Sequence, residues 1–317
     1  MADEPAVHGI HHVTCLAADP QANLSFYVGV LGMRLVKRSV NQDDPGTYHL
    51  FYADAVGTPG TDVTFFPRRG MAPGRRGVGQ VGEIALAVPA ASLGWWRERL
   101  ARRGVPLAEE TTRFGERALP FQDPDDLPLV LIGIEEERAF SPWETGPVPV
   151  EHQIRGVHAV RIRERVLAPT ARLLEETMGF REVAEEAGWH RYSAGEGSGA
   201  HAEVQEAPEA PYARWGAGAV HHVAWRVRDD EEQLAVRAAV EATGLTPTPV
   251  IDRFWFHSVY FKEPGGTLFE LATDGPGFHR DEVPERLGEK LVLPPWLEPH
   301  RGAIEAELPP LEMPATA

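Results

Sequence analysis

One structural unit recurs four times along this chain of 317 residues. In each copy a short run typical of a β-strand precedes a predicted helix, and a glycine followed by an apolar residue comes directly after the helix. Glycine suits the left-handed position at which many helices end, and the spacing of about 70 residues exceeds that of a typical solenoid repeat. The predicted helices cover residues 20–31, 91–103, 169–178 and 229–243, and the glycines are Gly32, Gly104, Gly179 and Gly244. The chain is therefore predicted to fold as four small α+β modules.

Runs typical of β-strands stand on both sides of each predicted helix. One strand leads into the helix and further runs follow it, consistent with three more strands and the module order βαβββ. Asp19 with Pro20, and Asp229, are residue types favoured at helix N-termini. The leading strands include residues 11–16, 83–88, 157–162 and 221–227, and the runs behind the helices include residues 48–52, 62–66, 129–132 and 259–261.

A proline-containing segment between the second and third modules predicts the domain organisation. We expect two paired-module domains, with modules 1 and 2 at residues 6–140 and modules 3 and 4 at residues 154–280, joined by a linker at residues 141–153. The repeated pattern stops after about residue 280. Residues 281–317 are therefore predicted to form an irregular C-terminal extension over the body.

Composition limits the classes of function. Hydrophobic residues make up 43% and charged residues 25% of the chain, as in soluble globular proteins. A formal net charge of −16 argues against a nucleic-acid partner, and no apolar run reaches the roughly 18 residues of a membrane span. The N-terminus, Met1–Pro5, lacks the features of a signal peptide. The single cysteine, Cys15, excludes an intrachain disulfide, so a cytoplasmic location is expected.

Two nearly duplicate phrases carry adjacent histidines. They are Gly-Ile-His-His-Val-Thr, which contains His12, and Ala-Val-His-His-Val-Ala, which contains His222; a third phrase, Gly-Gly-Thr-Leu-Phe-Glu-Leu, ends near Glu270. Two neutral imidazoles and one carboxylate are the protein ligands of non-haem Fe(II) sites, which leave coordination positions open. His12, His222 and Glu270 are therefore the predicted metal ligands, provided that the fold brings modules 1 and 4 together.

Strand register leaves alternatives at this site. Neighbouring side chains on a strand face opposite ways, so one histidine of each pair can face the cup of the sheet, and His11 or His221 could replace its neighbour as ligand. The leading strand of module 2 offers no histidine at the matching position, and that of module 3 offers Ala159. His158 aligns with His11, and it could serve in place of His12. We expect one complete site per chain.

Several long phrases in the first module carry a family resemblance. They cover residues 9–14, 26–36, 44–52 and 60–67. Together with the βαβββ repeat over about residues 8–280, they resemble the vicinal oxygen chelate superfamily (glyoxalase, bleomycin resistance protein and extradiol dioxygenase), and in particular the hydroquinone-type ring-cleaving dioxygenases. The resemblance implies an α+β fold in which paired modules form cupped mixed β-sheets flanked by helices.

The resemblance also implies a function and a ligand set. It implies an Fe(II)-dependent, extradiol-type ring-cleaving dioxygenase, with Mn(II) as the alternative metal, that inserts O2 into a hydroquinone- or catechol-type aromatic. It gives the second histidine of each pair and Glu270 as ligands. Residues near the metal in these enzymes match His11, Thr14, His221, Arg253 and Tyr260, the candidates for orienting the ligands, for acid–base assistance and for holding negative charge.

Two other functions fit the same fold. The first is a glyoxalase-like metal-dependent isomerase or lyase, although the closing strand of module 1, residues 61–66, has no glutamate to match Glu270. The second is a non-catalytic protein that sequesters a small aromatic and commonly lacks the metal triad. The sequence leaves the exact aromatic substrate undetermined, and it is compatible with a homo-oligomer.

Overall fold

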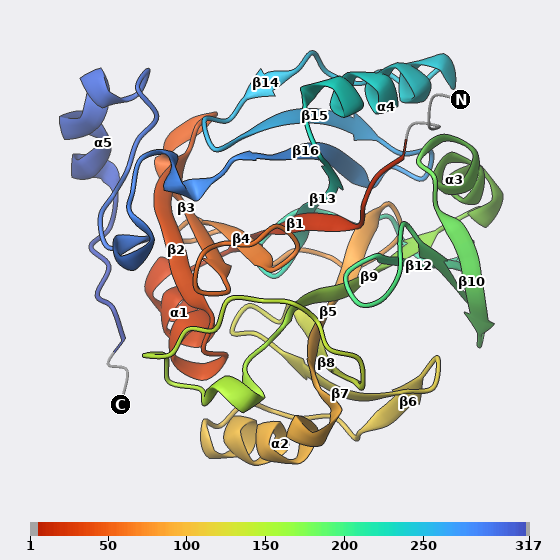
Figure 1. Ribbon diagram of the computed structural model, residues 1–317, viewed down its shortest axis with the longest axis horizontal. Coiled ribbons are helices and arrows are strands. Elements are labelled where there is room, and N and C mark those ends of the chain that lie inside the picture. Colours follow the sequence, from red (N-terminus) through yellow and green to blue (C-terminus); the bar gives the residue numbers. More distant parts are fainter. Residues whose placement is uncertain (1–5, 315–317) are drawn as a thin grey trace.

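Two eight-stranded mixed β-sheets form the body of the protein (Figure 1). The structure is a computed structural model that describes residues 6–314. The N-terminal segment examined for a signal peptide and the last three residues of the predicted extension lie outside the described residues. The expected α+β fold of paired βαβββ modules is confirmed.

The first sheet holds the strands of modules 1 and 4. Its order is β14-β15-β16-β13-β1-β4-β3-β2. The strands from module 1 are β1 (Ile10–Ala17), β2 (Arg34–Asn41), β3 (Asp44–Ala53) and β4 (Asp62–Pro67). Those from module 4 are β13 (Val220–Val227), β14 (Ile251–Asp252), β15 (Phe256–Lys262) and β16 (Leu268–Pro276).

The second sheet holds the strands of modules 2 and 3. Its order is β10-β11-β12-β9-β5-β8-β7-β6. Module 2 contributes β5 (Gln80–Pro89), β6 (Thr111–Arg113), β7 (Glu116–Gln122) and β8 (Pro128–Ile134). Module 3 contributes β9 (Gly156–Glu164), β10 (Arg181–Glu186), β11 (Trp189–Ser193) and β12 (His201–Glu206).

The pairing of modules within the sheets differs from the sequence-based expectation. Modules 1 and 2 were expected at residues 6–140 in one paired-module domain, and modules 3 and 4 at residues 154–280 in the other. Instead β1 pairs antiparallel with β13, and β5 pairs antiparallel with β9, so each sheet takes one module from each half of the chain. The leading strands resemble one another, so their own sequences do not determine which two pair. Packing between distant parts of the chain determines which leading strands pair. Residues 141–153 connect module 2 to module 3 along the chain, but they do not mark a boundary between the two sheets.

The four predicted helices are present. They are α1 (Pro20–Leu24) with a π-helical turn at Ser25–Val30, α2 (Leu93–Arg102), α3 (Leu167–Arg172) with a π-helical turn at Leu173–Thr177, and α4 (Asp230–Ala242). The Asp19 and Asp229 carboxylates cap α1 and α4 by accepting backbone N–H groups at 2.8 and 2.9 Å. The glycine after each helix has a positive φ between 70° and 91°, so the predicted left-handed positions are confirmed. Single 3-10 turns lie at Ala90–Ser92, Val150–His152, Phe278–Arg280, Pro284–Arg286 and Glu298–His300.

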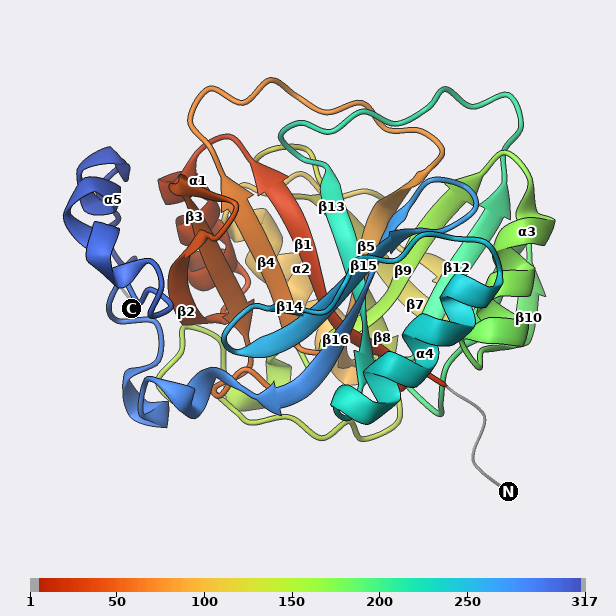
Figure 2. The same ribbon diagram turned by 90° about the horizontal axis from the view of Figure 1, so that it is seen from above.

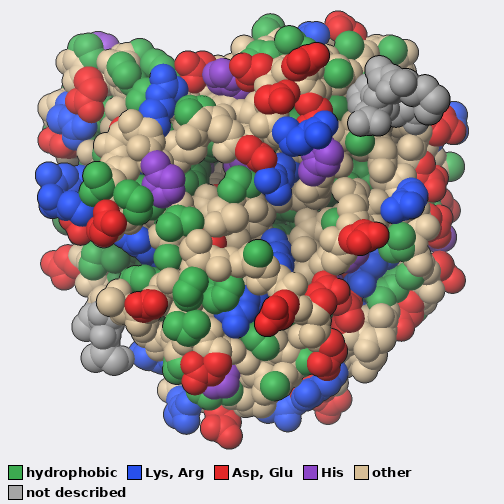
Figure 3. Space-filling view, in the orientation of Figure 1, with side chains coloured by type: hydrophobic (Ala, Val, Ile, Leu, Met, Phe, Trp, Pro, Cys, Tyr) green, Lys and Arg blue, Asp and Glu red, His purple; other side chains and the backbone are tan. Residues whose placement is uncertain are grey.

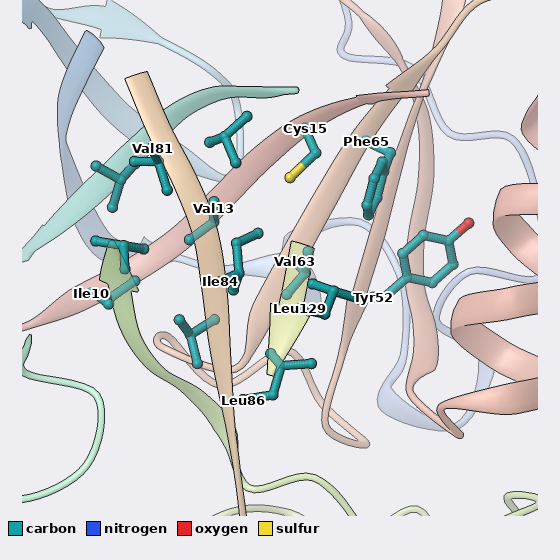
Figure 4. Close-up of a cluster of buried hydrophobic side chains, with 14 of the residues drawn as sticks. Ile10, Val13, Cys15, Tyr52, Val63, Phe65, Val81, Ile84, Leu86 and Leu129 are labelled. Atoms are coloured by element: carbon teal, nitrogen blue, oxygen red, sulfur yellow. The ribbon is translucent and has the colours of Figure 1, made fainter. Parts of the chain in front are cut away.

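The main hydrophobic core joins the two sheets. Val13 and Cys15 of β1 are fully buried in the same cluster as Ile84 and Leu86 of β5 (Figure 4). Successive side chains of a strand alternate between its two faces. Val13, Cys15 and Ala17 therefore fill the core, and His12 and Thr14 point to the opposite, cupped face.

The C-terminal extension packs along the edge of the first sheet. Figure 2 shows its helix α5 (Arg301–Glu307) and the C-terminal segment beside β2 and β3. The Val292 N–H donates to the Arg38 carbonyl oxygen (3.0 Å), and the Tyr48 hydroxyl donates to the Pro309 carbonyl oxygen (2.8 Å). The extension was predicted to be irregular, and this prediction is wrong at α5. Ile304 is the buried residue of this helix, so the helix has one apolar contact with the body.

The surface carries both signs of charge. Acidic and basic side chains are interspersed on the face seen in Figure 3. This face therefore presents no large area of a single charge that would attract one oppositely charged partner. Within residues 6–314, no helix combines the length and apolar character needed to cross a membrane.

A buried lysine anchors the extension. The Lys37 side chain on β2 is fully buried, and its Nζ donates to Asp281 Oδ1 (2.7 Å), to the Glu282 carboxylate and to the Phe278 carbonyl oxygen (3.2 Å). We expect Lys37→Met to lower the free energy of unfolding by about 3 kcal/mol, because two carboxylates lose their buried cation. Urea denaturation measures this loss. The exposed Lys290→Met is the matched control, expected to change stability by less than about 0.5 kcal/mol, and equal losses in both variants would contradict the anchoring role.

A pair of buried carboxyl groups links the two sheets. Glu164 ends β9, and Glu263 lies in the turn between β15 and β16. Thr267 Oγ1 donates to Glu164 Oε1 (3.0 Å), and Thr170 Oγ1 donates to Glu263 Oε2 (2.6 Å). Burial, and secondly the charge of Glu263, raise the pKa of Glu164 to about 8. The native state therefore holds a proton on Glu164 that the unfolded chain releases near its ordinary pKa of 4.5.

Because the native state holds this proton on Glu164, the free energy of unfolding is expected to depend on pH. Since the native state binds one more proton than the unfolded state between about pH 4.5 and 8, the contribution of Glu164 is complete below this window and is lost as pH rises through it, at up to about 1.4 kcal/mol per pH unit. Glu164→Gln removes the titrating group and is expected to flatten the profile and stabilise the protein at pH 8. Urea denaturation across this window measures the effect. The exposed Glu209→Gln should keep the wild-type slope, and an unaltered slope in Glu164→Gln would contradict the prediction.

Candidate metal centre

The three predicted ligands lie together on the cupped face of the first sheet. His12 Nε2 is 3.3 Å from both His222 Nε2 and Glu270 Oε2, and His222 Nε2 is 2.8 Å from Glu270 Oε2. The residues are 2%, 4% and 0% exposed, respectively. Among residues 6–314, this is the one group of three or more metal-ligating side chains whose donor atoms converge in this way.

Strand pairing brings the three residues together from distant parts of the sequence. In the antiparallel pair β1 and β13, Thr14 lies opposite His222, and His12 lies opposite Ala224. In the parallel pair β13 and β16, Ala224 lies beside Glu270. The three side chains thus come from neighbouring positions on three adjacent strands and share one face of the sheet.

The donor set fits a divalent metal ion. Three ligands on one face of an octahedron, each about 2.1 Å from the ion, lie about 3 Å from one another, which matches the observed separations. Glu270 Oε2 is buried and accepts no hydrogen bond from residues 6–314. Burial alone would raise the pKa of Glu270, but the His12 and His222 rings outweigh burial and hold the pKa well below its ordinary value. An ionised carboxylate and two imidazole nitrogens therefore face a common point.

The first histidine of each pair supports the second. The Nδ1 atoms of His11 and His12 are 2.9 Å apart, and those of His221 and His222 are 2.8 Å apart. Burial lowers the pKa of His11 and of His221 to about 3, so both rings are neutral. A neutral ring can accept a hydrogen bond from the Nδ1–H of its neighbour, which leaves Nε2 of the neighbour free to bind a metal. The alternatives that placed His11 or His221 at the metal find no support, since neither belongs to the convergent group.

His158, the other alternative ligand, lies in the second sheet. Its Nδ1 is 3.0 Å from Ser198 Oγ, and its Nε2 is 3.3 Å from Glu116 Oε2. Ion pairs occupy this region: Arg191 pairs with Glu116 (2.7 Å) and with Glu203 (2.6 Å). The charged groups around His158 therefore already have partners, and His158 does not belong to the convergent group of the first sheet.

A pocket opens to solvent beside the triad. Its walls combine aromatic and polar side chains, namely His12, Asn41, Gln42, Asp43, His49, Phe51, Phe66, His222, Arg253, Trp255, Phe256 and Tyr260. Phe51, Trp255 and Phe256 supply much of the aromatic part of this wall.

Two predicted catalytic residues line the pocket. Tyr260 on β15 lies opposite Glu270 of β16, and its ring centroid is 5.5 Å from that of His222. The Arg253 guanidinium lies 5.5 Å from the Tyr260 ring centroid, and it donates to Asp43 Oδ2 (2.8 Å). Burial raises the pKa of Tyr260 above its ordinary value, so its hydroxyl stays protonated and can donate a hydrogen bond.

Thr14 lies opposite His222 in the pair of β1 and β13. Its hydroxyl is fully buried and lies 2.8 Å from the Thr64 hydroxyl. Thr64 Oγ1 in turn lies 3.0 Å from His49 Nε2. Thr14 is therefore hydrogen-bonded to Thr64, and Thr64 contacts His49 in the pocket wall. This hydrogen bond of Thr14 does not involve His12, His222 or Glu270.

Sequence reasoning missed two residues of the site. Ser258 Oγ donates to Glu270 Oε1 (2.5 Å) and so orients the carboxylate. His49 lines the pocket. Alternation along the strand could have found Ser258, because it is two residues from Tyr260 and faces the same way. His49 had no comparable signal, because its role depends on Thr64 from another strand.

Comparison with known proteins identifies the family. The model of the glyoxalase/bleomycin resistance protein/dioxygenase superfamily matches residues 9–131 and 156–271. The chain belongs to this superfamily. It is 44% identical over 307 residues to the "Putative ring-cleaving dioxygenase MhqO" of Bacillus subtilis, with 96% of this chain and 97% of that protein covered. It is 33% identical to a chlorohydroquinone/hydroquinone 1,2-dioxygenase of Sphingobium indicum, with 92% and 93% covered.

Solved structures of this superfamily share the fold. A crystal structure of a "putative dioxygenase" from Bacillus subtilis superposes with a TM-score of 0.92 at 42% identity, covering 98% of this chain and 99% of the other. Glyoxalase I from Zea mays gives a TM-score of 0.62 at 17% identity, covering 84% and 92%. The second likeness concerns the fold alone.

Proposed function

We propose that this protein is an Fe(II)-dependent, extradiol-type ring-cleaving dioxygenase that inserts O2 into a hydroquinone- or catechol-type aromatic, with Mn(II) as the alternative metal. The observation that carries the proposal is the convergence of His12, His222 and Glu270 at the wall of an aromatic pocket. Three protein ligands leave coordination positions for substrate and O2. The names of the relatives as ring-cleaving dioxygenases support an O2-incorporating oxidoreductase.

Each residue of the site would have a defined role. The metal, when bound, supplies a Lewis acid that lowers the pKa of a phenol and a redox centre for O2. Phe51, Phe66 and Trp255 enclose the aromatic ring and exclude water. Tyr260 donates a hydrogen bond to an oxygen of the reacting group, and Arg253 stabilises negative charge beside it.

The geometry argues against the two rival functions. A glyoxalase-like isomerase would use a further carboxylate or amide ligand, but the position in module 1 that corresponds to Glu270 is Thr64, because Thr64 lies beside Thr14 as Glu270 lies beside Ala224. A protein that only sequesters an aromatic has no need of the complete triad. Neither rival explains an open set of three ligands.

Oxygen uptake tests the proposed function. The protein is loaded with Fe(II) under anaerobic conditions, its iron content is measured, and O2 is then added with hydroquinone or with catechol. We expect O2 consumption with at least one of the two and a ring-opened product. Iron-replete protein that consumes no O2 with either compound would refute the dioxygenase assignment.

A further inference from the structure

The cupped face of the second sheet carries arginine side chains. Val160 and Ile162 of β9 are fully buried in the core between the sheets. Side chains alternate along a strand, so Arg161 and Arg163 of β9 face the cup. Strand β9 lies between β5 and β12 near the middle of this sheet (Figure 2). The second cup therefore contains guanidinium groups, whereas the first cup contains the predicted metal ligands.

The internal repeat relates the second cup to the candidate metal centre. In module 4, the residue two positions after His222 lies beside Glu270. In module 3, Arg161 is two positions after Ala159 and lies beside Glu203. Glu203 is therefore the counterpart of Glu270, and alanine replaces the histidine ligand. The second cup keeps a carboxylate at this position but places a guanidinium group next to it.

Arginine and glutamate alternate in one row across the cup. The register places Arg191, Glu203, Arg161 and Glu83 side by side on β11, β12, β9 and β5. Arg161 Nε donates to Glu203 Oε2 (2.6 Å), and Arg191 donates to Glu203 Oε1 (2.6 Å). Arg113 of β6 donates to Glu83 Oε2 (3.2 Å). Each charged group of this row therefore has a partner of the opposite sign.

The next row across the cup has no carboxylate. It consists of Trp189, Gln205 and Arg163 on β11, β12 and β9. Arg163 Nε donates to Gln205 Oε1 (3.2 Å), which is an uncharged acceptor. Arg76, in the segment before β5, donates to the Asp126 carbonyl oxygen. Within residues 6–314 neither Arg163 nor Arg76 has a carboxylate partner, so two positive charges lack compensation.

These side chains line a pocket that opens to solvent, here called the arginine pocket. Its lining includes Arg76, Arg113, Arg161, Arg163, the Trp189 ring and the carboxylate of Glu83. Four arginines against one glutamate make this lining strongly basic, although the net charge of the chain is −16. It shares no lining residue with the pocket beside the triad. A concave surface of one charge concentrates ions of the opposite charge, so this pocket is suited to an anion.

The two guanidinium groups of β9 are held with their terminal nitrogens free. The guanidinium carbons of Arg161 and Arg163 lie 4.4 and 5.6 Å from the centroid of the Trp189 ring. Both side chains form hydrogen bonds through Nε, and their terminal nitrogens form none within residues 6–314. None of these terminal nitrogens is buried without a partner, so they are accessible to solvent. Their paired N–H groups match the oxygens of a carboxylate or a phosphate.

We propose that the arginine pocket binds a small dianion with carboxylate or phosphate oxygens. The terminal nitrogens of Arg161 and Arg163 donate to these oxygens, and the two negative charges compensate Arg163 and Arg76. Residues two positions apart on a strand are about 7 Å apart, so the two guanidinium groups can hold the two ends of a dicarboxylate or the oxygens of one phosphate. The site involves neither the metal nor the proposed oxygenase activity.

Calorimetric titration of the full-length protein tests the proposal. The probes are inorganic phosphate, succinate and acetate, at a pH above the second pKa of a phosphate group. Sodium chloride at about 0.15 M screens charges more than about 8 Å apart. We expect phosphate, succinate or both to bind with a dissociation constant of about 1 mM or below, and acetate to bind about ten-fold more weakly. Binding of succinate alone would identify an organic acid as the ligand, and binding of phosphate alone would identify a phosphate.

Variants of Arg163 locate the site. Arg163 is exposed, so its replacement leaves the core intact. Arg163→Gln should weaken binding about ten-fold or more, as loss of a hydrogen bond to a charged group does. Arg163→Lys keeps the charge but not the paired N–H groups, so it should recover only part of the affinity. The matched control is Arg69→Gln, an exposed arginine outside the arginine pocket, which should bind as the wild type does. Circular dichroism establishes that each variant is folded.

Several outcomes would overturn the proposal. Absence of binding by both dianions, or acetate binding as tight as that of succinate and phosphate, would exclude a dianion site. Full recovery of affinity in Arg163→Lys would show a diffuse attraction of charge without a built site. Loss of binding in Arg253→Gln, with full binding in Arg163→Gln, would place the anion beside the triad instead. Since no O2 is present, failure of the oxygenase assignment leaves these results unchanged.

Discussion

Replacing Glu270 with alanine is expected to abolish stoichiometric metal binding. Glu270 supplies the one carboxylate of the triad, and it is fully buried between two imidazoles. Loss of a residue that merely supports a ligand commonly lowers metal affinity by roughly 10–100-fold, so loss of the charged ligand itself should exceed this range. Metal content after dialysis, together with direct titration with Fe(II) under anaerobic conditions, measures the effect.

The matched control for Glu270→Ala is a histidine outside the triad. His158→Ala removes a histidine that the sequence offers as an alternative to His12, and His158 lies in the second sheet against Glu116. Its metal content should equal that of the wild type. Full metal retention in Glu270→Ala, or loss of metal in His158→Ala with the fold intact, would show that the ion binds elsewhere.

Tyr260→Phe is expected to reduce the turnover number for O2 uptake by about 100-fold or more while metal binding is retained. The Tyr260 hydroxyl stays protonated because burial raises its pKa, and its ring lies beside that of His222 in the pocket. Donation of a proton or hydrogen bond to a reacting group commonly contributes about 10²–10⁴-fold to a rate. Phenylalanine keeps the ring and removes only this donor.

Steady-state O2 consumption and metal content are measured together for Tyr260→Phe. A matched control is Tyr192→Phe, which removes a buried tyrosine hydroxyl in the second sheet and should leave the turnover number within about two-fold of the wild type. Normal turnover in Tyr260→Phe would exclude an acid role for its hydroxyl. Loss of metal in the same variant would instead assign Tyr260 to the integrity of the site.

The sequence predicts the parts of the fold that depend on neighbouring residues. The aspartates at the starts of α1 and α4 and the glycines at the helix ends have requirements that are met within one turn of chain, so their positions could be predicted. The convergence of His12, His222 and Glu270 could be predicted because the repeat makes two strands equivalent. Alternation along β1 then separates His12 from Val13 and Cys15.

Features that depend on distant pairing could not be predicted in this way. The four leading strands are alike, so their sequences do not specify that β1 pairs with β13 and β5 with β9. The contact of Thr14 with Thr64 and the orientation of His49 require the register of three strands at once. Helix α5 forms against a sheet edge that becomes available only after module 1 has folded.

The pairing of the first module with the last has a consequence for biosynthesis. His12 emerges early from the ribosome, whereas His222 and Glu270 follow only after more than 200 further residues. Until then the β1 edge that β13 will cover has no partner, and contacts of such large sequence separation form slowly. Uptake of the proposed metal therefore requires that synthesis has passed Glu270, because a nascent chain that ends before Glu270 presents at most two of the three ligands.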